Sequence, residues 1–361
     1  MLLSIFCIAF LYYISLVIIF NVEVKNEFEY QQQRIAELKQ NPNPPINESN
    51  FANFDIYDND LRLNEIQFLA THNSFKAMPS MYWSKFAEIF WGQKVRNGYY
   101  GLPYLTEQLD MGYRGLELDI ALYDGDFVLT HNPTTDWRTN GPDFRLALEE
   151  IKLWSDINQG HIPLNLMIQV RDTWAPYSHR FSAFKKQDLI KLDNLLKEIF
   201  GEEGIIKPAD VIGDNNTLRE AVENDGWPLL TDSMGKVFFS ILFDQQKNLD
   251  YYVDIDPTFA TQSSFVFTRP SAEITAYTAM ILADNPFEEG VEEMVGKNYI
   301  LRTRIDEQFE FSEERRQASI ELGSVILATD YPVGNLFPCN YVAKLTEDNK
   351  TIIQRGSVTF D

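Results

Sequence analysis

Two of the four histidines in this 361-residue chain follow short apolar runs. His72 is separated from Phe68-Leu69-Ala70 only by a threonine, and His131 comes directly after residues 127–130. Imidazole can accept and donate a proton near neutral pH, so two histidines in one site can act as general base and general acid. A lone histidine after a strand more often satisfies a backbone group in a capped turn. The chemical interpretation therefore requires His72 and His131 to meet in one site.

Two carboxylates stand in the apolar run between these histidines. Glu117 and Asp119 are separated by Leu118, and because side chains alternate along a strand, both carboxylates point to the same face. In a barrel interior they would repel each other, unless a divalent cation, which prefers carboxylate and amide oxygens, lies between them. The alternative is a solvent-exposed polar face, which the apolar neighbours Leu116 and Ile120 make less plausible.

The tetrapeptide Tyr123-Asp124-Gly125-Asp126 predicts a tight turn that joins two antiparallel strands. If the turn is centred on Gly125, His131 returns opposite Asp119, since each of them is six residues from that glycine. We therefore expect the second histidine beside the proposed metal.

Polar residues also end the apolar run at 164–170. Gln169 and Arg171 share one face by alternation. Gln169 could offer its amide oxygen to the metal, and the guanidinium of Arg171 could bind a phosphate through two hydrogen bonds. A salt bridge from Arg171 to a carboxylate at the rim of the sheet is an equally good interpretation.

Short apolar runs alternate with amphipathic stretches from residue 61 onward, which predicts parallel βα units and an α/β fold of the distorted TIM-barrel type. The hairpin makes the barrel irregular. Polar groups at the carboxyl ends of barrel strands are typical of active sites. The expected strands are 66–70, 115–122, 127–130, 164–170, 237–243, 264–267, 299–304 and 324–329, and the expected helices are 144–155, 183–200, 218–224, 272–283 and 313–322.

The composition excludes some partners. The formal net charge of -22 argues against a nucleic-acid partner and against general attraction to anionic lipid, because both need clustered Lys and Arg. Phosphate chemistry would then require a local cation, either a metal or a few arginines. With Cys7 and Cys339 as the two cysteines, the chain has no disulfide framework and no cysteine-based zinc site.

The first 20 residues contain no charged side chain, and a helix of this length can cross ~30 Å of hydrocarbon. We expect either an uncleaved membrane anchor or a cleaved signal peptide, and both place the rest of the chain outside the cytoplasm. Residues 21–60 predict a polar linker, residues 61–338 the barrel, and residues 339–361 a C-terminal tail that packs on it.

Residues 81–86 and 90–96 combine aromatic and basic side chains. They could dock at a lipid interface. A helix packed over the barrel rim explains the same aromatic residues equally well.

Eight short motifs in order resemble the phosphatidylinositol-specific phospholipase C superfamily, and more narrowly its calcium-dependent bacterial and fungal branch. The resemblance covers about residues 64–338. The motifs are FLATHNS at 68–74, GYRGLELD at 112–119, LTH at 129–131, WSDINQGHIP at 154–163, TLREA at 217–221, GWP at 226–228, LRTRID at 301–306 and TDYP at 329–332.

The resemblance implies a distorted TIM barrel that cleaves a phospholipid phosphodiester through attack by an inositol hydroxyl, giving a cyclic phosphate and diacylglycerol. It implies His72 and His131 as the acid–base pair, with His72 favoured as the base. It further implies a Ca2+ ion, or Mg2+ or another divalent cation, at a membrane surface. The implied ligands are Asn73, Glu117, Asp119 and Gln169, and the implied substrate-binding residues are Arg171, Arg304, Asp330 and Tyr331.

The sequence departs from the family pattern at Gln169, where a glutamate is usual. The two remaining carboxylates give the site a charge of about -2 rather than -3, and ligand charge tunes calcium affinity over orders of magnitude. This predicts weaker calcium binding, or a different metal or phosphodiester substrate. A barrel that binds lipid headgroups without turnover is the alternative function. For Arg304, an ion pair with Asp306 or Asp330 is the plainer interpretation.

Overall fold

The computed structural model describes residues 2–79, 85, 88, 89, 92, 99–131, 138–172, 180–307, 311–336 and 340–360. Most of the aromatic and basic stretch at 81–96 lies outside these residues, as does Cys339. The lipid-interface hypothesis for that stretch therefore stays a prediction.

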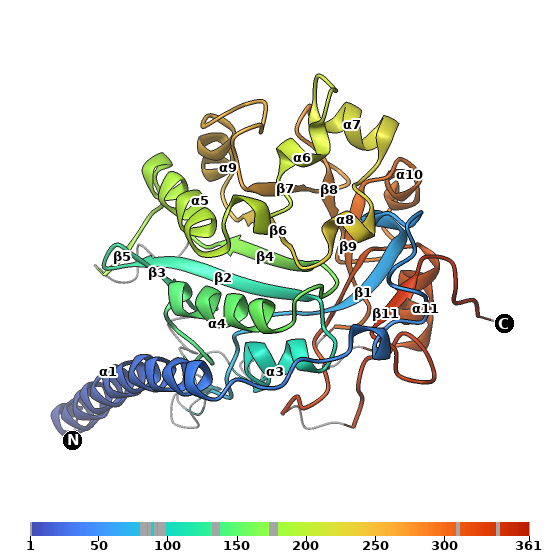
Figure 1. Cartoon of the computed structure of the whole chain (residues 1–361). Coiled ribbons are helices and arrows are strands. Elements are labelled where there is room, and N and C mark those ends of the chain that lie inside the picture. The colour runs from blue at the N-terminus through green and yellow to red at the C-terminus, as the bar shows by residue number, and fades with distance from the viewer. Residues whose placement is uncertain are drawn as a thin grey trace.

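Eight parallel strands in the described part of the chain close into a barrel, because β1 pairs with β10 on one side and with β2 on the other (Figure 1). This confirms the predicted α/β barrel of the distorted TIM type. The barrel strands are β1 (Ile66–Thr71), β2 (Gly115–Tyr123), β4 (Leu164–Val170), β6 (Val237–Phe243), β7 (Ser264–Thr268), β8 (Met280–Leu282), β9 (Ile300–Arg304) and β10 (Ile326–Thr329). Antiparallel additions are β3 (Asp126–Leu129) and β5 (Phe181–Ser182) on β2, and β11 (Ile352–Gln354) on β1.

Helices surround this barrel (Figure 1). Several begin with a side chain that caps the first turn: the Asp143 carboxylate accepts from the Leu146 N–H, and Thr217 and Ser312 cap two others in the same way. The helices are α1 (Leu2–Gln40), α3 (Leu105–Asp110), α4 (Phe144–Ile157), α5 (Lys186–Phe200), α6 (Pro208–Ile212), α7 (Leu218–Asp225), α8 (Leu230–Ser233), α9 (Gln246–Val253), α10 (Val291–Gly296) and α11 (Glu313–Glu321).

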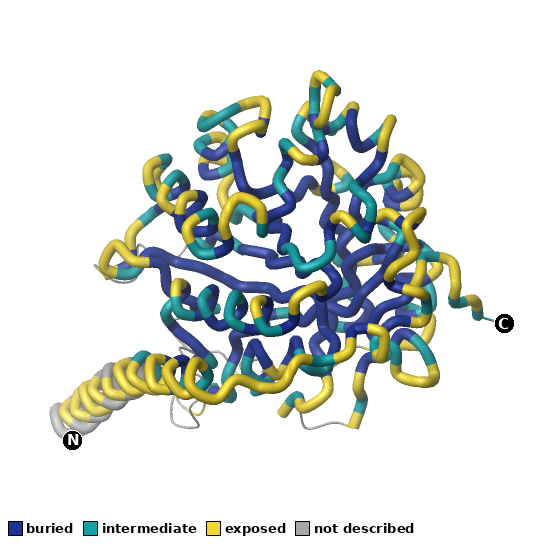
Figure 2. The backbone as a smooth tube through the Cα atoms, viewed as in Figure 1, coloured by how far each residue is buried: buried dark blue, intermediate teal, exposed yellow. Residues whose placement is uncertain are grey.

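The barrel strands are buried on both faces, as Figure 2 shows by their dark blue colour. On β2, Leu116, Leu118 and Ile120 pack in one apolar cluster with residues of α4 and α5. The alternate residues, Glu117 and Asp119, therefore face the barrel interior. The predicted common face of the two carboxylates is confirmed.

The expected helix at 272–283 was wrong. Met280–Leu282 forms strand β8, which pairs with both β7 and β9. The barrel needs a strand between these two neighbours to remain closed, and this tertiary pairing outweighs the local apolar period of the sequence. A short apolar run does not separate the two structures by periodicity alone.

The register of the hairpin also differs from the prediction. Asp124 and Gly125 both have positive φ values, 51° and 88°, and together form a two-residue turn, so Tyr123 pairs with Asp126. The predicted turn centred on Gly125 alone was therefore wrong by one residue. As a result Thr130, not His131, lies opposite Asp119, and the Thr130 N–H donates to the Asp119 carbonyl at 3.1 Å.

Residues 21–60, predicted as a linker, lie against the barrel over much of their length. Helix α1 continues to Gln40, and within it the side chains of Gln31 and Ile35 are buried. Beyond it, Glu48 forms a buried ion pair with Arg114 at 2.5 Å. In the part of the chain that the structure describes, no helix is long and apolar enough to cross a membrane.

Candidate active site

An aspartate holds His72 at the carboxyl end of β1. His72 Nδ1 lies 2.5 Å from Oδ1 of Asp330, which directly follows β10. Asp330 is buried, and its N–H donates to Asp306 Oδ1 at 2.8 Å. Although burial opposes the effect, His72 lowers the pKa of Asp330. Asp330 thus fixes the orientation of the imidazole and leaves its Nε2 atom 3.6 Å from Glu117 Oε1.

Asn73 follows His72 in the left-handed conformation, with φ 52°, which asparagine tolerates better than most residues. Its Nδ2 donates to the Tyr100 hydroxyl at 2.9 Å. Its Oδ1 is buried and has no hydrogen-bond partner among the described residues. The amide oxygen is therefore available for a ligand that the protein itself does not supply.

Glu117 is paired with an arginine from the opposite side of the barrel. Its Oε2 accepts from Arg302 Nη2 at 2.7 Å, and Arg302 also forms an ion pair with Asp284, which follows β8. Both Glu117 and Arg302 are buried. One oxygen of Glu117 is thus neutralised, while the other lies beside His72.

Asp119 is fully buried, and its two carboxylate oxygens have different surroundings. Oδ2 accepts from Arg171 Nε at 2.6 Å, whereas Oδ1 has no hydrogen-bond partner among the described residues. Burial raises the pKa of Asp119 to about 6; Arg171 opposes this rise and Glu117 adds to it. An unpartnered buried carboxylate oxygen is costly unless a cation satisfies it.

Gln169 lies beside Asp119 in the β2–β4 register, but its amide is already satisfied. Nε2 donates to Oδ1 of Asp244, the residue after β6, at 2.7 Å, and Oε1 accepts from Arg171 Nη2 at 3.3 Å. Arg171 Nη1 is also 3.8 Å from Asp244 Oδ2. The salt-bridge interpretation of Arg171 is therefore confirmed, and its contact with a substrate phosphate stays a prediction.

His131 is half-buried after β3. Burial, together with the positive charges of Arg171, His72 and Lys76, lowers the pKa of His131 to about 3. Because the Thr130 N–H bonds to the Asp119 carbonyl, His131 lies one residue past Asp119, at the carboxyl end of the strands where His72 follows β1. His131 is neutral near pH 7 in this structure.

The other three predicted substrate-binding residues, Arg304, Asp330 and Tyr331, contact other side chains of the protein. Arg304 forms an ion pair with Asp330, as the plainer interpretation of the sequence predicted. Its Nη2 also lies 3.4 Å from His72 Nδ1. Tyr331 is buried and packs edge-on against Tyr341. Direct substrate contacts by Arg304, Asp330 or Tyr331 stay predictions.

The chemistry of these side chains fits a calcium ion only in part. Asn73, Glu117 and Asp119 converge, and two of their buried oxygens lack a partner among the described residues. No cluster of three or more His, Cys, Asp or Glu side chains in the described residues could hold a metal, so the Asn73 amide would have to complete the set. The Gln169 oxygen accepts from Arg171 at 3.3 Å, and its part as a metal ligand stays a prediction.

A cavity of about 770 Å³ adjoins the site at the carboxyl ends of β6 and β7. Gln169 and Asp244 line its inner side, and Thr268, Arg269 and Glu273 provide further polar groups. The lining therefore offers both hydrogen-bond donors and acceptors.

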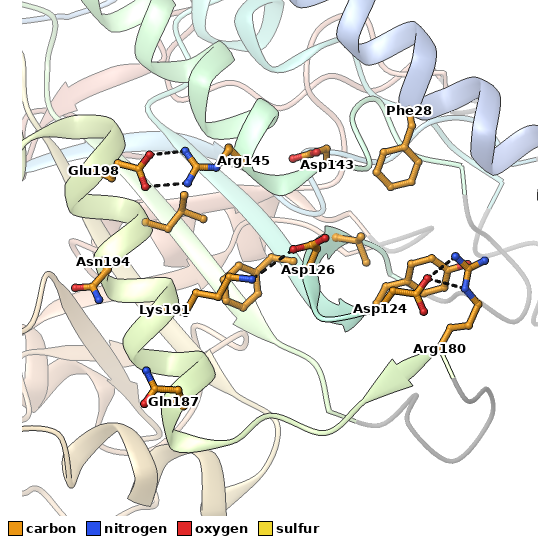
Figure 3. A pocket seen from close by; sticks show the side chains of 14 residues that line it. Phe28, Asp124, Asp126, Asp143, Arg145, Arg180, Gln187, Lys191, Asn194 and Glu198 are labelled. Atoms are coloured by element: carbon orange, nitrogen blue, oxygen red, sulfur yellow. Dashed lines mark hydrogen bonds and ion pairs between the residues drawn. The ribbon is translucent and has the colours of Figure 1, made fainter.

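A second cavity, of about 730 Å³, lies outside the barrel between the β2–β3 hairpin and helix α5 (Figure 3). Its charged side chains pair with one another: Arg145 with Glu198, Lys191 with Asp126, and Arg180 with Asp124. This cavity holds none of the residues that surround His72.

Sequence reasoning missed three charged residues of the site. Asp244 and Asp284 follow barrel strands β6 and β8, so the rule that singled out His72 after β1 would have found Asp244 as well. Asp284 was hidden because its strand was predicted as a helix. Lys76 is buried four residues after His72 and carried no clear signal in the sequence.

Known structures of the same fold are distant in sequence. A calcium-dependent phosphoinositol-specific phospholipase C from Pseudomonas sp. is 18% identical in its apo form, with a TM-score of 0.57 over 78% of this chain and 94% of that chain. Its complex with myo-inositol is 17% identical, with a TM-score of 0.57 over 79% and 95%. A Ca2+-dependent phosphatidylinositol-specific phospholipase C from Streptomyces antibioticus is 17% identical, with a TM-score of 0.55 over 75% and 95%.

None of the curated protein sequences matches this chain. The sequence does match a family described as "Phosphoinositide phospholipase C, Ca2+-dependent", over residues 61–127 and 122–354. This match spans the whole barrel, including both histidines and the paired carboxylates. The chain therefore belongs to the Ca2+-dependent phosphoinositide phospholipase C family.

Proposed function

We propose that this chain is a calcium-dependent phosphodiesterase that cleaves an inositol phospholipid as a phospholipase C. The observation that carries the proposal is the convergence of the His72–Asp330 pair with Asn73, Glu117 and Asp119 at the carboxyl end of the barrel. A protein that only binds headgroups has no need of proton-transferring histidines. Family membership adds the reaction class.

His72 is the general base in this proposal. Asp330 Oδ1 accepts a hydrogen bond from the Nδ1–H of His72, so the lone pair that takes a proton is on Nε2, and substrate replaces the Asn73 amide nitrogen that lies 3.2 Å from it. That proton comes from the inositol hydroxyl next to the phosphate, and the hydroxyl oxygen then attacks phosphorus. General base catalysis of this kind typically contributes ~10²–10⁴-fold.

His131 is the general acid. As the bond between phosphorus and the diacylglycerol oxygen breaks, His131 gives its proton to that oxygen, and a cyclic inositol phosphate remains. The pKa of about 3 in the free site would leave His131 without this proton at pH 7. A bound phosphate anion favours the charged imidazolium, so we expect the substrate to bind before His131 becomes protonated.

Asn73, Glu117 and Asp119 would hold the calcium ion, or Mg2+ or another divalent cation. Such an ion would supply positive charge that stabilises negative charge developing on the phosphate. The cavity beside Gln169 and Asp244 has the size and polarity for the inositol ring.

The test is hydrolysis of phosphatidylinositol by the full chain, with calcium titrated against a chelator. We expect turnover that depends on calcium and falls at least ~10²-fold in both His72→Gln and His131→Gln. His161→Gln is the matched control, because His161 is buried against Ser155, outside the site, and should keep the rate of the folded protein. Turnover that is unaffected by chelation, or retained in His72→Gln, would contradict the proposal.

A second candidate is a barrel that binds headgroups without turnover. It is favoured by Arg171, which occupies oxygens of both Asp119 and Gln169 that a metal would otherwise use. Calorimetry distinguishes the two functions: this candidate predicts binding of myo-inositol phosphate without hydrolysis of any phosphodiester, and without calcium binding in the same site.

A further inference from the structure

Helix α1 has two halves with different surroundings. Residues 1–22 contain no Asp, Glu, Lys or Arg, whereas Glu23, Lys25, Glu27 and Glu29 follow at once. Figure 1 shows the N-terminal half standing clear of the barrel. Its described apolar side chains are exposed: Phe10 by 54%, Leu11 by 65%, Ile14 by 37%, Ile18 by 59% and Val22 by 52%.

The C-terminal half of α1 runs alongside α4 in the same direction. Gln31 Oε1 accepts from the N–H of Asp143, the residue before α4, and Gln31 Nε2 donates to the Asp143 carbonyl at 2.9 Å. At the other end, Leu38 lies with Leu153 and Ile157, near the end of α4. Residues earlier than Gln31 therefore extend beyond the start of α4.

The start of α4 is level with the catalytic end of the barrel. Asp143 forms a bridge to Val128 of β3, and Val128 pairs with Ala121, which lies two residues beyond Asp119 on β2. Because α4 begins at the carboxyl end of the strands and α1 runs parallel to it, the N-terminal half of α1 projects past the catalytic end.

The packed half of α1 is firmly held. Gln31 is fully buried, and a Cβ atom on Gly141 would come within 2.6 Å of its Nε2, so a larger residue there would displace the Gln31 amide. Arg34 forms an ion pair with Glu150 at 2.5 Å and stacks 3.8 Å over the Tyr104 ring. These contacts fix the direction in which the N-terminal half points.

We propose that the apolar half of α1 enters the lipid bilayer that carries the substrate, and that α1 acts as a rigid stalk holding the catalytic end of the barrel toward that bilayer. Gln31 lies nine residues after Val22, a rise of about 14 Å along the helix, which sets the distance between the apolar segment and the barrel. The bilayer as the source of substrate rests on the proposed function, but the orientation does not.

A bilayer is the occupant that the chemistry of this segment fits best. A protein groove would leave part of the uncharged surface of residues 1–22 in water, whereas lipid can surround a helix whose sequence has no charged face. The net charge of -22 argues against general attraction of the barrel to anionic lipid, whereas an apolar segment enters lipid without any need for positive charge.

The experiment uses the full chain with vesicles of phosphatidylcholine that contain a minor share of phosphatidylinositol. Two positions report orientation through their reaction with a bulky polyethylene-glycol maleimide. Asp126→Cys is exposed at the carboxyl end of the barrel, and Gln159→Cys is exposed at the amino end. Peptide-resolved mass spectrometry separates these thiols from Cys7 and Cys339.

We expect vesicles to slow labelling of Asp126→Cys at least threefold and to leave Gln159→Cys unchanged. Lys25→Pro breaks the helix between its two halves, so it should still float with vesicles but lose this shielding. Lys25→Ala is the matched control, since it removes only the exposed ion pair with Glu29 and should behave as the wild type.

Two results would overturn the inference: a full chain that does not float with vesicles, or one that floats while both thiols react at unchanged rates. Equal shielding of Asp126→Cys in Lys25→Pro and Lys25→Ala would refute the claim that a rigid α1 orients the barrel. None of these readouts uses turnover. Shielding of Asp126→Cys without hydrolysis would therefore refute the proposed function alone, and hydrolysis without shielding would refute the orientation alone.

Discussion

Replacing Gln169 by glutamate tests whether the charge at this position sets the stability of the site and its affinity for calcium. In the structure Gln169 Nε2 donates to Asp244 Oδ1 at 2.7 Å. Gln169→Glu replaces this donor with a charged acceptor, so two carboxylates would face each other. At that separation, like charges in a medium of effective dielectric constant ~20 repel by up to ~6 kcal/mol.

Arg171 reduces this repulsion, because it lies 3.3 Å from Gln169 Oε1 and 3.8 Å from Asp244 Oδ2. We therefore expect Gln169→Glu to lower the free energy of unfolding by about 2–4 kcal/mol at pH 8 in chelator, which includes the lost hydrogen bond. Added calcium should reverse most of this loss. A third carboxylate should also tighten calcium binding by roughly tenfold or more.

Urea unfolding and calorimetric titration with calcium measure the two effects. The double variant Gln169→Glu with Asp244→Asn is the matched control, because it exchanges donor and acceptor and keeps the net charge. It should unfold within about 1 kcal/mol of the wild type. If Gln169→Glu is as stable as the wild type in chelator and its calcium affinity is unchanged, residue 169 neither repels Asp244 nor contributes to a calcium site.

Three further substitutions test other parts of the structure. Asp330→Asn presents an amide donor to His72 Nδ1 and forces the proton onto Nε2; turnover should fall by ~10²–10⁴-fold with little change in KM. The pKa of His131 is lowered to about 3, so below about pH 6.5 the unfolded chain binds a proton that the folded protein does not, and the folded protein loses stability as the pH falls. Between pH 7 and pH 5, in chelator, the free energy of unfolding should fall by about 2 kcal/mol more in the wild type than in His131→Gln. Glu48→Gln leaves buried Arg114 without its charge partner and should lower the free energy of unfolding by about 3 kcal/mol, whereas Glu29→Gln on the exposed face of α1 should not.

The sequence predicted the strands that carry the site more accurately than their neighbours across the barrel. Leu164–Val170 and Val237–Phe243 were predicted to the residue, and alternation placed Glu117 and Asp119 on one interior face. Both results depend on patterns within a single strand. The hairpin register failed because it depends on φ at Asp124 as well as at Gly125, and an aspartate can adopt either sign of φ.

The partners of the site residues could not be predicted, because each pair joins elements far apart in the chain. Gln169 meets Asp244 across 75 residues, and His72 meets Asp330 across 258. Alternation states which face a side chain occupies, but not which of several carboxylates on that face it will contact. The family resemblance selected Asp330 as a site residue, and only the fold reveals that it contacts the catalytic histidine.

Arg171 contacts both Asp119, which would bind calcium, and Gln169, where the family usually has glutamate. Its guanidinium neutralises Asp119 in the structure, so a calcium ion that uses both Asp119 oxygens has to compete with it. Asp244 lies 3.8 Å from the same guanidinium and offers it a second carboxylate. If Arg171 moved from Asp119 to Asp244 when calcium binds, no buried charge would be left unpaired, so the free-energy cost of the movement would be low. Gln169 is uncharged and donates to Asp244, so Asp244 is the carboxylate that can take over Arg171 when calcium binds Asp119.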